Sequence, residues 1–424
     1  MPTPGQLQSG ASLLAGILVG WIIAFGWSHR TSSPVPDSVP PAGDAVRARI
    51  ALVEPQAPRA PGQDSGPWGD LEVRSVWLEP PVEDIPSSTC DTRPPAWYVR
   101  GQTRASLPAL LTALGVPKDL GPALAGVAEF YDEGVVISPP AEVVIALPSD
   151  VRARLYTLLE PERMNGFIRF GFRAGARDFE ERLATAGLSP ATVSLFQRLA
   201  YRDGPMVRVA DIALLCARAA SDTDRLRIVM TLARTRSLIA SLVLQRGADV
   251  AALGRYWTVG AGPSEAASML EAVGRVGGKV DIEHLLPPLG RDRLNRFPDG
   301  TGTALECFWT SLNFAALEPD DSLALPGVGG PVLDARYAAV ADIRYDMTRD
   351  IGQAEALRGL RFGDLLALED DTNLISHLVV HIAGDIVFTK NGTGVWNPWV
   401  LTRFQDVVET YPRTTHAQVL RLRE

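Results

Sequence analysis

The chain has 424 residues, 46% of them hydrophobic, so it is long enough for two or three domains with sizeable cores and is not a disordered chain. Its net charge of −8 and isoelectric point near 5.3 argue against non-specific nucleic-acid binding, because neutralising phosphates requires a concentrated basic surface. We therefore expect no nucleic-acid partner.

Only three of the 41 basic residues are lysine, and this arginine excess is typical of GC-rich bacterial genomes. The three cysteines, Cys90, Cys216 and Cys307, are too few and too scattered for a disulfide framework or a zinc cluster. Cys90 lies among turn residues and is interpreted as a loop cysteine. Cys216 falls on an apolar helical face, which predicts a buried, inert thiol. We expect no metal and no cofactor.

Residues 11–27 (ASLLAGILVGWIIAFGW) carry no charge. A helix of this length spans about 25 Å, which is within the range of bilayer-spanning segments. The segment therefore predicts a single membrane anchor within residues 1–27. The alternatives are a buried core helix or a cleaved signal peptide, but the run lacks a preceding Lys or Arg and a following A-x-A site. Residues 28–69 are rich in proline and predict a semi-extended tether.

Residues 70–277 are predicted to begin with short strands, in LEVRSVWLEP and AWYVR, on either side of a turn-rich stretch. From residue 106 onward, apolar residues recur three and four apart, as in PSDVRARLYTLLEP and DRLRIVMTLARTRSLIASLVLQ. This pattern predicts a mainly helical middle region of antiparallel helices. No repeat of fixed length is evident, no catalytic grouping is found, and the protein partner of this region is unknown.

Gly277 and Gly278 break the helical pattern, and we place the start of a C-terminal domain, 278–424, at this point. In DGTGTALECFWTSLNFAAL, apolar spacing predicts a helix with Cys307 in or just after its first turn. Exposed backbone N–H groups and the helix dipole favour a thiolate there, which is typical of a nucleophile. The other interpretation is a cysteine that fills a helix interior beside Phe308 and Trp309.

Three strands are predicted beyond this helix, in RFGDLLALED, HLVVHIAG and IVFTKNG. Alternation along the second strand places His377 and His381 on one face. A cysteine nucleophile needs a nearby base that can return the proton to the leaving group. One of the two histidines would serve as that base and the other would pack or line a cleft. His377 is preferred because it opens its strand.

The C-terminal part resembles the NlpC-like cell-wall cysteine peptidases of the papain superfold. The resemblance lies in the order of its features, which are a cysteine at a helix start, a G-D strand, a strand opened by histidine and a further strand with a polar residue. The resemblance covers residues 300–412. It implies that Cys307 is the nucleophile, His377 the base, and Thr389 or Asn391 the residue that orients the imidazole. Asn391 also suits a hairpin turn before Gly392. This chain departs from the family's usual pattern in having bulky residues after its cysteine.

The expected fold class is therefore α+β, with an N-terminal membrane anchor, a mainly helical middle region and a C-terminal papain-like α+β domain that has a small antiparallel sheet. The expected function is that of a membrane-tethered thiol hydrolase, in which the resemblance implies cell-wall peptides as substrate. The alternative is a non-catalytic, membrane-anchored binding protein with a degenerate peptidase fold. The basic residues Arg30, Arg47 and Arg49 after the apolar run favour a cytoplasmic C-terminal part, whereas the character of the C-terminal domain favours an extracytoplasmic, periplasmic one.

Overall fold

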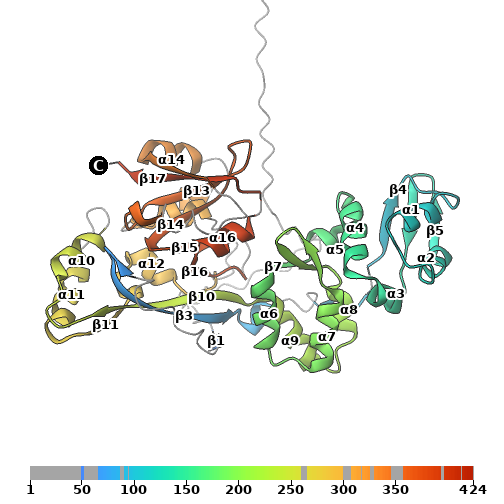
Figure 1. Cartoon of the computed structure of the whole chain (residues 1–424), viewed down its shortest axis with the longest axis horizontal. Helices are drawn as coiled ribbons and strands as arrows, with labels where there is room; N and C mark the ends of the chain where they lie inside the picture. Colours follow the sequence, from blue (N-terminus) through green and yellow to red (C-terminus); the bar gives the residue numbers. More distant parts are fainter. Residues whose placement is uncertain are drawn as a thin grey trace, which may run out of the picture. The chain divides into compact units, whose positions relative to one another are not determined.

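The computed structural model describes the residues coloured in Figure 1, which are 49–51, 65–85, 90–93, 95–258, 265–298, 307–316, 318–324, 329–344, 357–392, 396–411 and 413–423. The predicted anchor at residues 11–27 and most of the predicted tether lie outside these ranges. Within them, no helix is both long and apolar enough to cross a bilayer. The anchor that we included in the expected fold class therefore has no counterpart in the described structure.

A long antiparallel sheet joins distant parts of the chain. Its strands run in the order β1-β3-β10-β11, and β2 pairs with β3. The pairing of β3 with β10 extends from Leu78 opposite Thr235 to Asp70 opposite Val243. The strand bounds are β1 (Arg49–Ala51), β2 (Ser65–Gly66), β3 (Gly69–Glu79), β10 (Thr235–Leu244) and β11 (Gly278–Asp281).

The segment between β3 and β10, residues 80–234, forms an inserted module that contains the same arrangement twice. Each unit has a strand, two helices, a hairpin of two strands and a further helix, and the last strand lies in the centre of a three-stranded antiparallel sheet. The first unit comprises β4 (Trp97–Arg100), α1 (Leu107–Ala113), α2 (Gly121–Gly126), β5 (Ala128–Tyr131), β6 (Gly134–Ile137) and α3 (Ala141–Ala146). The second comprises β7 (Phe172–Gly175), α6 (Ala176–Ala184), α7 (Pro190–Leu199), β8 (Tyr201–Asp203), β9 (Met206–Val209) and α8 (Ile212–Ala217).

The remaining elements of the module connect these units to each other and to the long sheet. Residues of both units share one hydrophobic core, which includes Trp97, Tyr156 and Phe196. The connecting elements are η1 (Val82–Asp84), α4 (Ser149–Leu159), η3 (Arg163–Asn165), α5 (Gly166–Arg169) and α9 (Asp222–Ala233).

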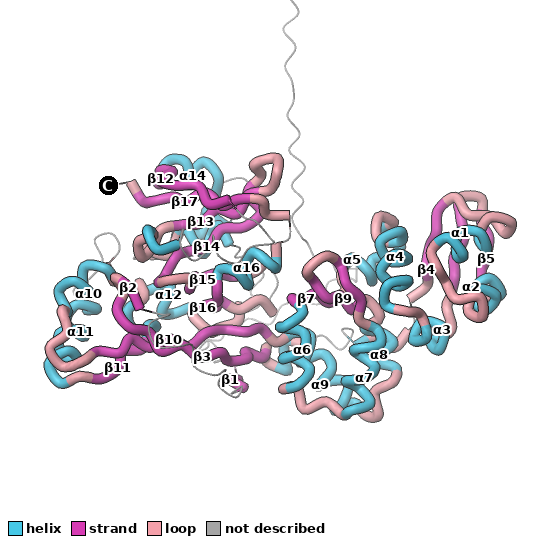
Figure 2. The backbone as a smooth tube through the Cα atoms, in the orientation of Figure 1, coloured by secondary structure: helices cyan, strands magenta, loops and turns pink. Residues whose placement is uncertain are grey.

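The prediction of a mainly helical middle region is wrong, because strands and helices alternate through it, as Figure 2 shows. The helices predicted in PSDVRARLYTLLEP and in the first half of DRLRIVMTLARTRSLIASLVLQ are confirmed as α4 and α9. Strands of three or four residues, such as β7 and β8, are too short to give a clear period-two pattern, so the neighbouring helical pattern dominated the prediction.

The largest single error is β10, which was assigned to the helix that precedes it. Leu238 and Leu242 are four residues apart, which fits a helical face as well as a strand. In the structure, burial alternates along β10 from Leu238 onward, with Ala240 and Leu242 buried between partly exposed neighbours. Pairing with β3 on one side and β11 on the other therefore overrides the local helical signal.

The C-terminal part contains a six-stranded antiparallel sheet in the order β12-β17-β13-β14-β15-β16. The three strands expected between residues 361 and 392 are confirmed as β13 (Leu365–Glu369), β14 (Ile375–Ala383) and β15 (Ile386–Lys390). The other strands are β12 (Tyr337–Arg344), β16 (Trp399–Arg403) and β17 (His416–Leu422).

Short helices surround this sheet and the end of β10. The core that contains Leu242 of β10 also includes Leu270 and Leu378, so packing continues across the glycines at 277 and 278. The bounds are α10 (Val250–Tyr256), α11 (Glu265–Val276), η4 (Ile282–Leu285), α12 (Pro288–Arg293), α13 (Cys307–Leu312), η5 (Asp321–Ala324), α14 (Gly329–Arg336), η6 (Leu357–Gly359) and α16 (Phe404–Thr410).

A disulfide joins Cys90 to Cys216 across a sequence separation of 126 residues, with their Cα atoms 5.6 Å apart. The interpretation of Cys90 as a loop cysteine and Cys216 as an inert thiol is therefore wrong. Sequence spacing could not reveal the pair, because the fold of the inserted module brings the two residues together. The pairing leaves Cys307 as the cysteine outside the disulfide.

We predict that replacing both Cys90 and Cys216 with serine lowers the free energy of unfolding by about 2–4 kcal/mol, because the disulfide restricts the unfolded chain over a long loop. Denaturant titration with and without a reductant measures the effect. The reductant should destabilise the natural protein and leave the double variant unchanged. Equal stability of the natural protein in both conditions would contradict the prediction.

Candidate functional site

The six-stranded sheet carries helices on both faces. Leu378 and Val380 of β14 share a core with Trp309 and Leu312 of α13. Val379, between them, belongs to a second core that contains Val407 and Val408 of α16. The alternation expected along β14 is therefore present, and β14 lies between the two helices.

His377 lies near the start of β14 and is held from two directions. Its side chain is buried, and Nε2 is 2.8 Å from Oγ1 of Thr389 on the neighbouring strand β15. The ring of Tyr411, just after α16, stacks on the imidazole with ring centroids 4.2 Å apart and planes 15° apart. These contacts fix both the position and the plane of the imidazole.

Burial lowers the pKa of His377 to about 3, and a hydrogen-bonding interaction with the Asn391 side chain opposes this shift. The cause is desolvation, because a buried site disfavours the charged imidazolium. At neutral pH the imidazole is therefore uncharged, and one ring nitrogen can accept a proton.

Thr389 and Asn391 were both predicted as the residue that orients the imidazole. The structure places Thr389 in hydrogen-bonding contact with Nε2. The Asn391 side chain lies close enough to His377 to oppose the shift of its pKa, but the buried Oδ1 of Asn391 forms no hydrogen bond of good geometry with the part of the chain that is described. Of the two, Thr389 makes the better-defined contact.

His381, the alternative base, is bound through both ring nitrogens. Nδ1 lies 3.0 Å from the carbonyl oxygen of Arg361, and Nε2 lies 3.1 Å from that of Gly384. Desolvation lowers its pKa, and the two backbone carbonyls oppose the shift. Because both nitrogens face acceptors, His381 is suited to joining the strand to the adjacent loop, which is the packing role foreseen for one of the two histidines.

Cys307 is the first residue of α13 and is half-buried. Ser311, one helical turn further on, donates a hydrogen bond of 3.1 Å to the carbonyl of Leu378, next to His377. Burial raises the pKa of Tyr411, and the charge of Cys307 raises it further. The thiol therefore lies within electrostatic range of the ring that stacks on His377.

Tyr411 is the site residue that sequence reasoning missed. Tyr411 follows a short amphipathic helix, and the number of residues between it and His377 matches no recognisable motif. Only the folding of α16 onto the sheet brings the two rings together. Among the described residues, no group of three or more histidine, cysteine and acidic side chains could hold a metal ion.

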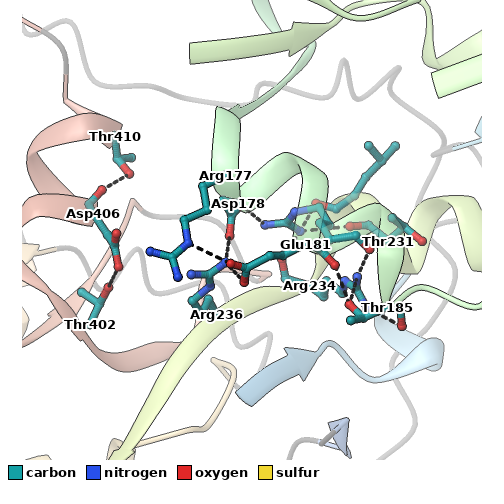
Figure 3. A network of polar contacts seen from close by, with 12 residues as sticks. Arg177, Asp178, Glu181, Thr185, Thr231, Arg234, Arg236, Thr402, Asp406 and Thr410 are labelled. Atoms are coloured by element: carbon teal, nitrogen blue, oxygen red, sulfur yellow. Dashed lines mark hydrogen bonds and ion pairs between the residues drawn. The ribbon is translucent and has the colours of Figure 1, made fainter. Parts of the chain in front are cut away.

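A network of charged side chains lies beside α16, where α6 approaches the start of β10 (Figure 3). Arg236 pairs with Glu181 at 2.5 Å and approaches Asp178 at 3.6 Å. Burial raises the pKa of Asp406 on α16, while the nearby Arg236 guanidinium opposes the shift. Thr402 donates a long hydrogen bond of 3.5 Å to the Asp406 carboxyl. The inserted module and the helix that precedes Tyr411 are therefore electrostatically linked.

No protein-family model, no curated protein and no solved structure matches the chain. The resemblance described from the sequence therefore stays a prediction. A proposal for the function therefore depends on the geometry and chemistry of the side chains around His377.

We predict that stability falls as the pH drops below about 6.5 and continues to fall towards about pH 3. In this range the unfolded imidazole of His377 binds a proton and the folded one does not. By about pH 5 this residue alone should destabilise the fold by about 2 kcal/mol relative to neutral pH. Denaturant titrations of the natural protein and of His377→Gln at both pH values measure the difference.

His284→Gln is the matched control, because it makes the same change at an exposed histidine. It should keep the pH dependence of the natural protein, whereas His377→Gln should reduce it. An identical pH dependence for the natural protein and His377→Gln would show that His377 is not buried in its neutral form.

Proposed function

We propose that the C-terminal part of the chain is a thiol hydrolase of the NlpC-like type that cleaves an amide bond, with Cys307 as nucleophile and His377 as base. The observation that carries this proposal is the fixed imidazole of His377, with Thr389 at Nε2 and Tyr411 stacked on the ring within range of the thiol's charge. In the proposed mechanism Nδ1, the ring nitrogen that does not face Thr389, exchanges a proton with the thiol.

In the proposed first half-reaction, His377 Nδ1 removes the proton of the Cys307 thiol as Sγ bonds to the amide carbonyl carbon. The backbone N–H of Cys307 donates a hydrogen bond to the oxyanion. His377 then gives the proton to the leaving nitrogen, the C–N bond breaks and a thioester remains. Water loses a proton to His377 and attacks the thioester, which releases a carboxylic acid and returns the proton to Sγ.

Cell-wall peptides are the substrate class that the family resemblance implies. The disulfide between Cys90 and Cys216 supports an extracytoplasmic setting, because disulfides persist in oxidising compartments and are rare in the cytosol. We therefore propose that the reaction takes place in the bacterial periplasm.

A second candidate function is non-catalytic binding by a degenerate peptidase fold. The observation that favours it is the burial of His377, whose side chain is only 1% exposed. A base that serves a substrate must reach the reacting atoms. In addition, burial lowers the pKa of His377, so the imidazole resists protonation. The two functions differ in the reactivity that they predict for Cys307.

We predict that iodoacetamide alkylates Cys307 in the folded protein faster than in the urea-unfolded protein at neutral pH. The disulfide occupies the other two cysteines, so the mass gained by the intact protein reports this thiol alone. His377→Gln should slow hydrolysis of cell-wall peptides by about a hundredfold to ten-thousandfold, the range of general-base catalysis. Cys307→Ala should abolish hydrolysis.

Thr389→Val should lower the rate of hydrolysis by about tenfold, because it removes the hydroxyl at Nε2 and preserves the shape of the side chain. Thr402→Val is the matched control on the next strand, and it should have no such effect. If folded Cys307 reacts no faster than the unfolded thiol and no cell-wall peptide is cleaved, the non-catalytic function replaces the hydrolase.

A further inference from the structure

The segment that joins the two units of the inserted module exposes two large apolar side chains. Met164 in η3 is 68% exposed, and Phe170, directly after α5, is 52% exposed. The Phe170 ring folds back over Gly166, since a Cβ at that glycine would lie 3.6 Å from it. Neither side chain contributes to the core of the module or to the proposed catalytic site.

This segment is fixed to the module in spite of its exposed side chains. The buried Asn165 amide binds β4 in both directions, because Oδ1 accepts from the Tyr98 N–H and Nδ2 donates to the Tyr98 carbonyl, each at 2.8 Å. Nδ2 also donates to the carbonyl of Leu159 at 2.8 Å, and the Ile168 side chain is fully buried. Met164 and Phe170 are therefore presented from a fixed backbone, which reduces the entropy lost when a partner binds.

A cavity of about 230 Å³ lies between this segment and β4. The Tyr98 hydroxyl, the one polar side-chain group among its lining residues, donates a hydrogen bond of 3.3 Å to the Glu133 carbonyl. A cavity of this size and character suits one aliphatic or aromatic side chain. Its lining residues are Pro95, Ala96, Tyr98, Val136, Met164 and Phe167.

Two basic side chains belong to the segment that borders the cavity. Arg163 and Arg169 are exposed, and neither forms an ion pair within the described ranges. The acidic side chains of the same stretch are already paired, Glu160 with Arg173 and Arg208 and Glu162 with Arg100. The two arginines can therefore meet negative charges on a partner, although the chain as a whole is acidic.

We propose that Arg163, Met164, Phe167, Arg169 and Phe170, together called the Met164 surface, bind an acidic peptide segment of a protein partner. One apolar side chain of the peptide enters the cavity, and carboxylates on either side meet the arginines. Methionine suits such a surface, because its flexible thioether adapts to side chains of different shape. The Asn165 amide occupies the edge of β4, so the peptide binds through side chains and does not add a strand to the sheet.

The test is a display selection of short random peptides on the full chain, with a counter-selection on Ala96→Trp. Ala96 is exposed and lines the cavity, so the indole fills it without disturbing the core. We expect the enriched peptides to combine acidic residues with a leucine, methionine or aromatic residue. Binding, measured by fluorescence anisotropy of one enriched peptide, should weaken at least about tenfold in Ala96→Trp.

Three further variants separate the contributions of shape and charge. Ala123→Trp makes the matched change at an exposed alanine of α2 and should bind like the natural protein. The double variant Arg163→Glu, Arg169→Glu should bind at least about tenfold more weakly, whereas Arg255→Glu on α10 should not. The circular dichroism of each variant confirms folding.

Three outcomes would overturn the proposal. The first is that no acidic peptide is enriched, and the second is that the enriched peptides bind Ala96→Trp as tightly as the natural protein. The third is that vesicles of anionic phosphatidylglycerol bind through Met164 and Phe170 while the peptides do not, which would make the surface a membrane contact.

Discussion

The antiparallel pairing of β3 with β10 is the constraint on which the rest of the structure depends. It brings residues 69–79 next to residues 235–244, so the chain enters and leaves the inserted module at neighbouring points. The same two strands also contact the C-terminal sheet, since Val76 and Leu78 of β3 pack with Phe297 and Val400. A single long hairpin-like pairing therefore holds the duplicated units on one side and supports the edge strand β16 on the other.

The C-terminal strands could be predicted because each is a continuous apolar run bounded by glycine, aspartate or asparagine. In β13 and β15 every residue is buried, so local composition and final environment agree. The prediction failed where one pattern fits two structures, as in β10, whose leucines match both a helix and a strand. The duplicated units were also missed, because their elements correspond in order and pairing, whereas their sequences share no fixed period. In these regions long-range pairing decides the local structure.

The residues of the candidate site also divide into those that the sequence predicts and those that it does not. Cys307, His377 and Thr389 could be proposed from the sequence because a helix start, a strand start and a neighbouring strand are each visible in it. Tyr411 and the disulfide between Cys90 and Cys216 were not, since both depend on where separate elements pack. The disulfide also changes the chemistry that can be tested, because it removes two thiols and leaves Cys307 as the group that an alkylating reagent reports.

The position of His377 depends on more than its own sheet, because α16 links it to the inserted module. The final turn of α16 delivers Tyr411 to the imidazole. Near the helix start, Asp406 lies in the field of Arg236, and a Cβ added at Gly175 of β7 would lie only 3.0 Å from the Glu409 carboxylate. The inserted module therefore lies close to α16 at Gly175 as well as at Arg236. A shift of the inserted module against α16 would therefore move the ring that holds His377, which ties the geometry of the proposed base to a part of the chain that supplies none of the reacting groups.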